Sequence, residues 1–190
     1  MNLERRQFLK SCGVFTAGAA AGLVLPTTLR SLSAGGPSAE ARLRELGIEL
    51  PAVGTPANPF VPAVRAGNIL YTSGTGPKKA DGEYVRGKVG TDLSLEDGKA
   101  AARLTGLHIL AAVRNNLGSL DKVVRLVKVL GMVNCATTFK QQPAVINGFS
   151  ELIIEVFGLE AGKGARSAVG MGSLPGNIPV EIEAIFQVRD

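Results

Sequence analysis

The sequence predicts an α+β fold, in which a mixed sheet of about six strands carries two helices on one face. Three observations support this prediction. Residues Val180–Val188 alternate apolar and mostly polar side chains at period two, as expected for a strand with one buried face. Residues 95–117 and 143–157 repeat apolar side chains at helical spacing. Each of these helices is followed by a strand pattern, which places both helices over one sheet.

The first elements have local start and stop signals. Val61–Ser73 predicts a hairpin, because Gly67 can supply the positive φ that a tight turn requires. Residues 82–90 are expected to add an edge strand. Ser94 is a good helix N-cap before acidic residues, and Gly118 is a typical stop signal for the helix that follows it.

The second half repeats this order of elements. Leu120–Cys135 predicts a central strand, since Val and Leu alternate there with basic residues. Thr137-Thr138 is expected to cap the next helix, in which Pro143 occupies an early turn, and Gly158 ends it. With both helices on one face, the opposite face of the sheet is left exposed. Residues 126–133 and 180–188 contain more apolar side chains than is expected for a solvent-exposed face, which indicates an interface.

The chain divides into three predicted regions. Residues 1–33 contain the pair Arg5-Arg6 and then an Ala/Gly-rich apolar run, which resembles a twin-arginine export signal. That run is too short to span a hydrocarbon core of about 30 Å. We therefore expect a periplasmic or secreted protein with no stable membrane anchor after signal cleavage. Residues 34–60 form an extended lead-in that includes a short helix at 39–46, and residues 61–190 form the domain.

Composition excludes several classes of function. Residues 34–190 hold 17 of the 21 basic and 15 of the 16 acidic side chains, which is no electrostatic footprint for nucleic acid. One cysteine, Cys135, remains after the signal, and its simplest role is that of a buried small hydrophobic residue. The single histidine, His108, is expected on an apolar helix face against the sheet. No motif indicates a metal site or a cofactor.

The C-terminal stretch carries a resemblance to a known family. It contains Ala165-Arg166-Ser167, then Leu174-Pro175, then the run Val-Glu-Ile-Glu-Ala-Ile at 180–185. This combination resembles the end of the Rid family (YjgF-like, reactive intermediate deaminases), and the resemblance covers roughly residues 45 to 190. It implies a chorismate-mutase-like fold and a homotrimer packed sheet to sheet, with a pocket at each subunit boundary.

The resemblance also implies an activity. Members hydrolyse enamines or imines such as 2-aminoacrylate to 2-oxo acids and ammonia without a cofactor. Arg166 would hold the carboxylate of a 2-imino acid, and Glu181 would position the attacking water. Phe60, Ser73, Gly74 and Asn147 correspond to substrate-binding positions. From the residues alone, Arg166 could equally be an exposed strand-end arginine and Glu181 an outward-facing strand carboxylate.

Four positions depart from the family pattern. Phe60 stands where many members have a tyrosine, Thr75 replaces a glutamine, Ser150 replaces an aromatic residue, and Gly164 replaces a proline. These changes predict a wider and less polar pocket in a divergent branch. The alternative to the deaminase is a non-catalytic trimeric module that binds a small carboxylate or acts as a holdase.

Overall fold

The structure is a computed structural model, and it describes residues 38–54 and 59–190. The predicted twin-arginine signal in residues 1–33 lies outside these ranges. Among the helices within them, none combines the length and the apolar character that crossing a membrane requires.

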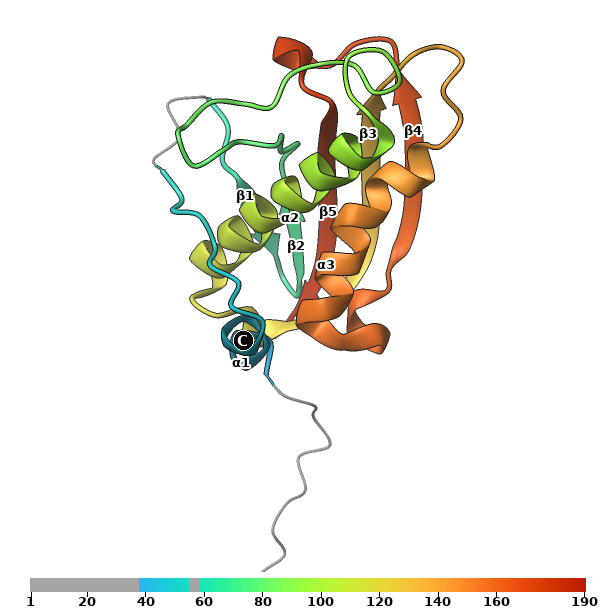
Figure 1. Cartoon of the computed structure of the whole chain (residues 1–190). Coiled ribbons are helices and arrows are strands. Elements are labelled where there is room, and N and C mark those ends of the chain that lie inside the picture. Colours follow the sequence, from blue (N-terminus) through green and yellow to red (C-terminus); the bar gives the residue numbers. More distant parts are fainter. Residues whose placement is uncertain (1–37, 55–58) are drawn as a thin grey trace, which may run out of the picture. The chain divides into compact units, whose positions relative to one another are not determined.

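A mixed sheet forms the centre of the fold, with strands in the order β1-β2-β5-β3-β4 (Figure 1). β3 and β4 are parallel, and the other neighbouring pairs are antiparallel. The strands are β1 (Ala63–Ala66), β2 (Ile69–Thr72), β3 (Val123–Asn134), β4 (Ala165–Met171) and β5 (Val180–Val188). The predicted α+β fold class is confirmed, with five strands in the described part of the chain in place of about six.

Helices α2 (Leu95–Leu117) and α3 (Gln142–Gly162) cover the same face of this sheet (Figure 1). The backbone N–H of Asp97 donates to the Ser94 hydroxyl, and the Asp97 carboxylate accepts from the Ser94 N–H, so a capping box starts α2 as expected. Gly118 ends that helix with φ of 81°. The short helix α1 (Ala39–Glu45) packs beside α3 and contributes Leu43 to the core.

Small residues let α2 and α3 pack closely on each other and on the sheet. A methyl group at Gly148 would overlap the carbonyl oxygen of Lys99, and one at Gly106 would lie 2.8 Å from Cδ2 of Leu152. Phe149 is fully buried between these elements. This close packing fixes the position of α3 relative to β3 and β4, and with it the position of the side chains that α3 presents to their edge.

Two local predictions are wrong. Residues 82–90 form no strand, because Gly82, Gly87 and Gly90 have φ of 90°, 127° and 84°, which a regular strand does not accommodate. This segment makes only isolated bridges to other parts of the chain. Helix α3 begins at Gln142 and is not capped by Thr137-Thr138, although Pro143 does occupy its first turn as predicted.

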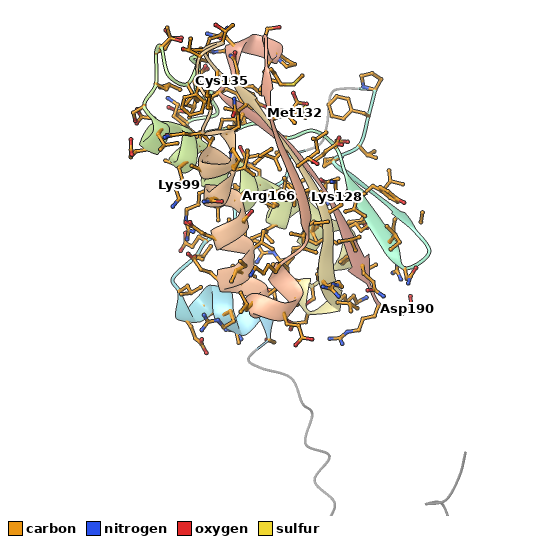
Figure 2. The ribbon with its side chains drawn as sticks, turned by 90° about the vertical axis from the view of Figure 1, so that its right-hand side faces the viewer. Lys99, Lys128, Met132, Cys135, Arg166 and Asp190 are labelled. Carbon is orange, nitrogen blue, oxygen red and sulfur yellow. The ribbon has the colours of Figure 1, made fainter. Side chains whose placement is uncertain are left out.

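The face of the sheet opposite the helices is called the open face here. The side chains that it presents include Tyr71, Lys128, Leu130, Met132, Glu181, Glu183 and Ile185. Tyr71 is 48% exposed, and a shallow depression of about 240 Å³ lies beside it. Figure 2 shows Lys128 and Met132 on this side of the molecule and Lys99 on the helical side. An apolar and charged surface of this kind agrees with the predicted interface, which stays a prediction.

Candidate active site

Arg166 lies at the start of edge strand β4, next to α3 (Figure 2). It pairs in register with Val129, which is 1% exposed and faces the helices, so the Arg166 side chain also leaves the sheet on the helical side. Its Nη1 atom donates to Oδ1 of Asn147 at 2.9 Å and to Oγ of Ser150 at 3.0 Å. Two residues one helical turn apart on α3 therefore hold the guanidinium in place.

The charge of Arg166 is not neutralised by these contacts. Both acceptors are uncharged, and within residues 38–54 and 59–190 no carboxylate forms an ion pair with this guanidinium. A groove of about 400 Å³ lies beside it, between α3 and the beginning of β4. A fixed and uncompensated guanidinium at a groove is suited to bind a carboxylate, which it can contact through two parallel N–H groups.

Glu181 lies near the start of β5, on the other side of the sheet. It pairs with Met132, which is an odd number of positions from Val129 along β3, so Glu181 points to the open face. A methyl group at Gly74 would overlap its Oε1 atom, so the carboxyl group lies directly over that glycine. Partial burial, and after it the negative charge of Glu183, raise the pKa of the Glu181 carboxyl above its ordinary value.

The residues around Gly74 are fixed by hydrogen bonds to neighbouring backbone. Ser73 donates its hydroxyl proton to the Val61 carbonyl at 2.6 Å, and Thr75 exchanges two backbone hydrogen bonds of 3.0 Å with Ile182. The Thr75 hydroxyl donates to the Ser73 carbonyl, so it is turned toward its own loop. Phe60, just before Val61, is 53% exposed. Ser73 thus ties the backbone that follows Phe60 to the loop that contains Gly74.

The predicted site residues therefore form two groups in a single chain. Arg166 and Asn147 meet beside α3, whereas Glu181 lies over Gly74 at the start of β5, with Ser73 as the preceding residue in the chain. Phe60 is exposed just before Val61, to which Ser73 is bonded. Within one chain Arg166 and Glu181 do not face the same pocket, because β3 lies between β4 and β5 and the two side chains leave opposite faces of the sheet.

Sequence reasoning did not assign a role to Ser150 as a partner of Arg166. Its spacing of three residues from Asn147 on a helix was the available signal, because such residues share a face. Lys163, which lines the same groove, was also missed. It is the first residue after α3, and the next residue, Gly164, packs closely against Leu126.

The remaining candidates for chemistry are accounted for by packing. His108 does not lie against the sheet as expected: it is half-buried, and its Nε2 is 2.7 Å from the Lys78 carbonyl oxygen in the loop that follows β2. Cys135 is buried beside Gln142, as predicted. Among the residues that the structure describes, no cluster of three His, Cys, Asp or Glu side chains could hold a metal ion.

Comparison with known proteins identifies the family of this fold. The family model described as "YjgF/chorismate_mutase-like, putative endoribonuclease" matches residues 40–181. Protein TCP17 of Trypanosoma cruzi is 41% identical over 150 residues, which cover 79% of this chain and 94% of that protein.

Two solved structures agree with this match. Atu1372 of Agrobacterium tumefaciens, a protein of unknown function, is 43% identical, with a TM-score of 0.71 over 79% of this chain and 91% of that one. A protein of Shewanella oneidensis MR-1, whose description also names an endoribonuclease, is 28% identical, with a TM-score of 0.75 over 80% of this chain and 100% of that one. The chain therefore belongs to the YjgF/chorismate-mutase-like family.

Proposed function

We propose that this protein hydrolyses reactive 2-imino acids, and the enamines from which they form, to 2-oxo acids and ammonia. The observation that carries the proposal is the Arg166 guanidinium, which is fixed by two neutral oxygens beside a groove of about 400 Å³. Holding the substrate carboxylate there would place the adjacent C=N carbon at a defined position. Positioning of this kind lowers the barrier for a bond that is already activated.

Glu181 is the group that would handle protons in this reaction. As a carboxylate it accepts a proton from water while the water oxygen bonds to C2 of the imine. It returns this proton to nitrogen, which gives the carbinolamine. Glu181 then takes the hydroxyl proton of the carbinolamine and passes it to nitrogen, so that the C=O bond forms as the C–N bond breaks and ammonia leaves. No electrons are transferred in this hydrolysis. The raised pKa of Glu181 supports the role, because a group that gains and loses a proton works best when its pKa lies closer to the working pH.

A complete pocket would need two copies of the chain. Arg166 and Glu181 leave opposite faces of one sheet, so each would meet the other only across a boundary between subunits. We propose that the open faces pack together in a homotrimer, and that Arg166 of one copy meets Glu181 and Gly74 of its neighbour. The exposed Tyr71 on the open face supports burial of this surface in an assembly.

Endoribonuclease activity fits this chain less well. Residues 34–190 hold 17 basic and 15 acidic side chains, and aromatic residues, on which bases could stack, make up only 5% of the chain, with no tryptophan. The one histidine is bonded to the carbonyl oxygen of Lys78 in a packed loop. These features favour a small carboxylate over an RNA substrate.

The test is release of 2-oxo acid and ammonia from imino acids generated in place by an amino-acid oxidase. The full chain should accelerate hydrolysis over the spontaneous rate. Arg166→Ala should lower kcat/KM about 10²-fold, because a charge-assisted, two-point contact with the carboxylate is lost. Arg166→Lys should recover part of the rate, since it restores the charge without the planar fork. Arg103→Ala is the matched control, because Arg103 pairs with Glu155 on the helical surface, 2.7 Å away.

Equal rates for the wild type and Arg166→Ala would overturn the assigned role of Arg166. If several imines are hydrolysed no faster than without protein, the enzymatic proposal fails. Binding of a 2-oxo acid that is lost in Arg166→Ala would then support the non-catalytic carboxylate-binding module.

A further inference from the structure

The groove beside Arg166 is larger than a single carboxylate group. Its floor is apolar, formed by Leu126 and Val129, which are 2% and 1% exposed, and Ile154 of α3 forms part of its wall. A volume of about 400 Å³ lies within the range of pockets that hold whole small molecules. The side chain of a substrate held by Arg166 can therefore continue along the groove.

A second cation lies in this groove. The glycines on both sides of Lys163 pack too closely against their neighbours to carry a side chain. A methyl group added at Gly162 would lie 2.7 Å from Cα of Ile154, and one added at Gly164 would lie 2.8 Å from Cγ of Leu126. The backbone of Lys163 is thus fixed at the level of Ile154. The guanidinium of Arg166 is fixed at the level of Ser150, one helical turn or about 6 Å away along α3.

The charges of the groove favour an anion. Lys163 takes part in no ion pair with the residues that the structure describes, and neither does Arg166. One carboxylate, Glu151, lines the groove, but Nζ of Lys99 lies 2.8 Å from it and compensates its charge. Arg166 and Lys163 both line this groove, whose floor is apolar, so both cations are available to one ligand.

We infer that this groove selects short 2-imino dicarboxylates. Arg166 holds the carboxylate next to the C=N bond, the intervening carbons lie over Leu126 and Ile154, and Lys163 contacts the distal carboxylate. A lysine suits this second contact, because it acts as a mobile point charge and imposes no planar geometry. The inference rests on the proposed hydrolysis and adds the substrate class to it.

The test compares two imino acids of similar size, formed by oxidases from glutamate and from leucine. Lys163→Gln should lower kcat/KM for the glutamate-derived imine about five- to tenfold, because one charge contact with substrate is lost. It should leave the leucine-derived imine within about twofold. Lys140→Gln is the matched control, since Lys140 is an exposed lysine that does not line the groove.

Binding of stable product analogues gives an independent readout. Calorimetry should show that 2-oxoglutarate binds more tightly than 4-methyl-2-oxopentanoate, and that Lys163→Gln removes this difference while Arg166→Ala weakens both. The dicarboxylate inference is overturned if both ligands and both imines respond equally to Lys163→Gln. In that case, hydrolysis that still depends on Arg166 leaves the proposed function standing. If neither imine is hydrolysed, the proposed function fails. The binding curves of the two product analogues then still show whether Lys163 binds a second carboxylate.

Discussion

Arg166 and Glu181 lie on β4 and β5, which follow each other in the C-terminal sequence, yet their surroundings differ in almost every respect. Arg166 stands at the edge of the helix-covered face, and two neutral side chains of α3 hold its guanidinium at 2.9 and 3.0 Å. Glu181 stands on the open face over Gly74, and within the described residues its carboxylate accepts no hydrogen bond. Two hydrogen bonds fix the Arg166 side chain, whereas partial burial raises the pKa of Glu181, which therefore holds its proton more tightly.

The two environments suit the two roles that the proposed hydrolysis assigns to Arg166 and Glu181. The charge of a guanidinium is insensitive to its surroundings, so it benefits from hydrogen bonds that fix its direction. A carboxyl group that must gain and lose a proton benefits from partial burial, which raises its pKa. Because these two environments lie on opposite faces of the sheet, their use in one reaction requires a second copy of the chain.

The strongest test of this comparison is complementation between two inactive variants. Arg166→Ala and Glu181→Gln should each lose most activity, because each removes one half of every pocket. Unfolding and refolding an equal mixture should form mixed oligomers, in which about one quarter of the boundaries join an intact Arg166 to an intact Glu181. Steady-state hydrolysis of the mixture should then rise to about one quarter of the wild-type rate.

The double variant provides the control for this experiment. Refolded in equal amounts with wild type, it should also leave about one quarter of the boundaries intact if the site is shared, but about one half if each chain has its own site. Absence of any recovery in the mixture of single variants, together with the value of one half in the control, would contradict the shared pocket.

A smaller effect on activity is expected when the Glu181 carboxylate is displaced by a substitution at another residue. In Gly74→Ala the new methyl group would overlap Oε1 of Glu181, and the flexible carboxylate should shift to relieve the contact. A displacement of about 1 Å can cost about 10²-fold in kcat, while the free energy of unfolding should change little. Steady-state kinetics and urea unfolding of the same preparation measure the two quantities.

Gly172→Ala is the matched control for this substitution. A methyl group at Gly172 meets no atom within 4 Å, and its φ lies outside the left-handed region, as that of Gly74 does. It should leave both kcat and stability unchanged. Equal kinetic losses in the two variants would mean that the position of the Glu181 carboxylate is unimportant for the rate.

Local signals in the sequence were sufficient for most of the fold. The hairpin turn at Gly67, the cap at Ser94 and the stop at Gly118 each depend on the chemistry of a few adjacent residues, and all are confirmed. The pattern at 82–90 failed because glycines with positive φ interrupt a segment whose composition resembles a strand. The predicted position of His108 is wrong for a different reason, because the loop that contains Lys78 covers its side of α2.

The candidate site was predictable as a set of residues and not as an arrangement. β4 and β5 follow each other in sequence, but this order does not show whether Arg166 and Glu181 face the same side of the sheet. The structure inserts β3 between them, and their opposite directions depend on its register with both neighbours. Ser150 departs from the aromatic residue of the family pattern, but its hydrogen bond to Arg166 depends on how α3 packs over the sheet. Such long-range register is not encoded in the pattern of any single segment.

The smallest expected effect concerns the pH dependence of stability. The pKa of Glu181 is raised above its ordinary value of 4.5 by partial burial and then by Glu183, so the folded state binds the proton more tightly than the unfolded state. As pH rises above 4.5, the unfolded chain ionises first, and the wild-type free energy of unfolding falls until the folded carboxyl is also ionised. Glu181→Gln lacks this fall, so its stability relative to wild type should increase with pH over that interval.

In Glu183→Gln the fall should persist but be smaller, because burial, the larger cause, remains. Urea unfolding at a fixed protein concentration and a series of pH values measures all three chains, and a difference between wild type and Glu181→Gln that is constant with pH would show that the open face does not desolvate this carboxyl group.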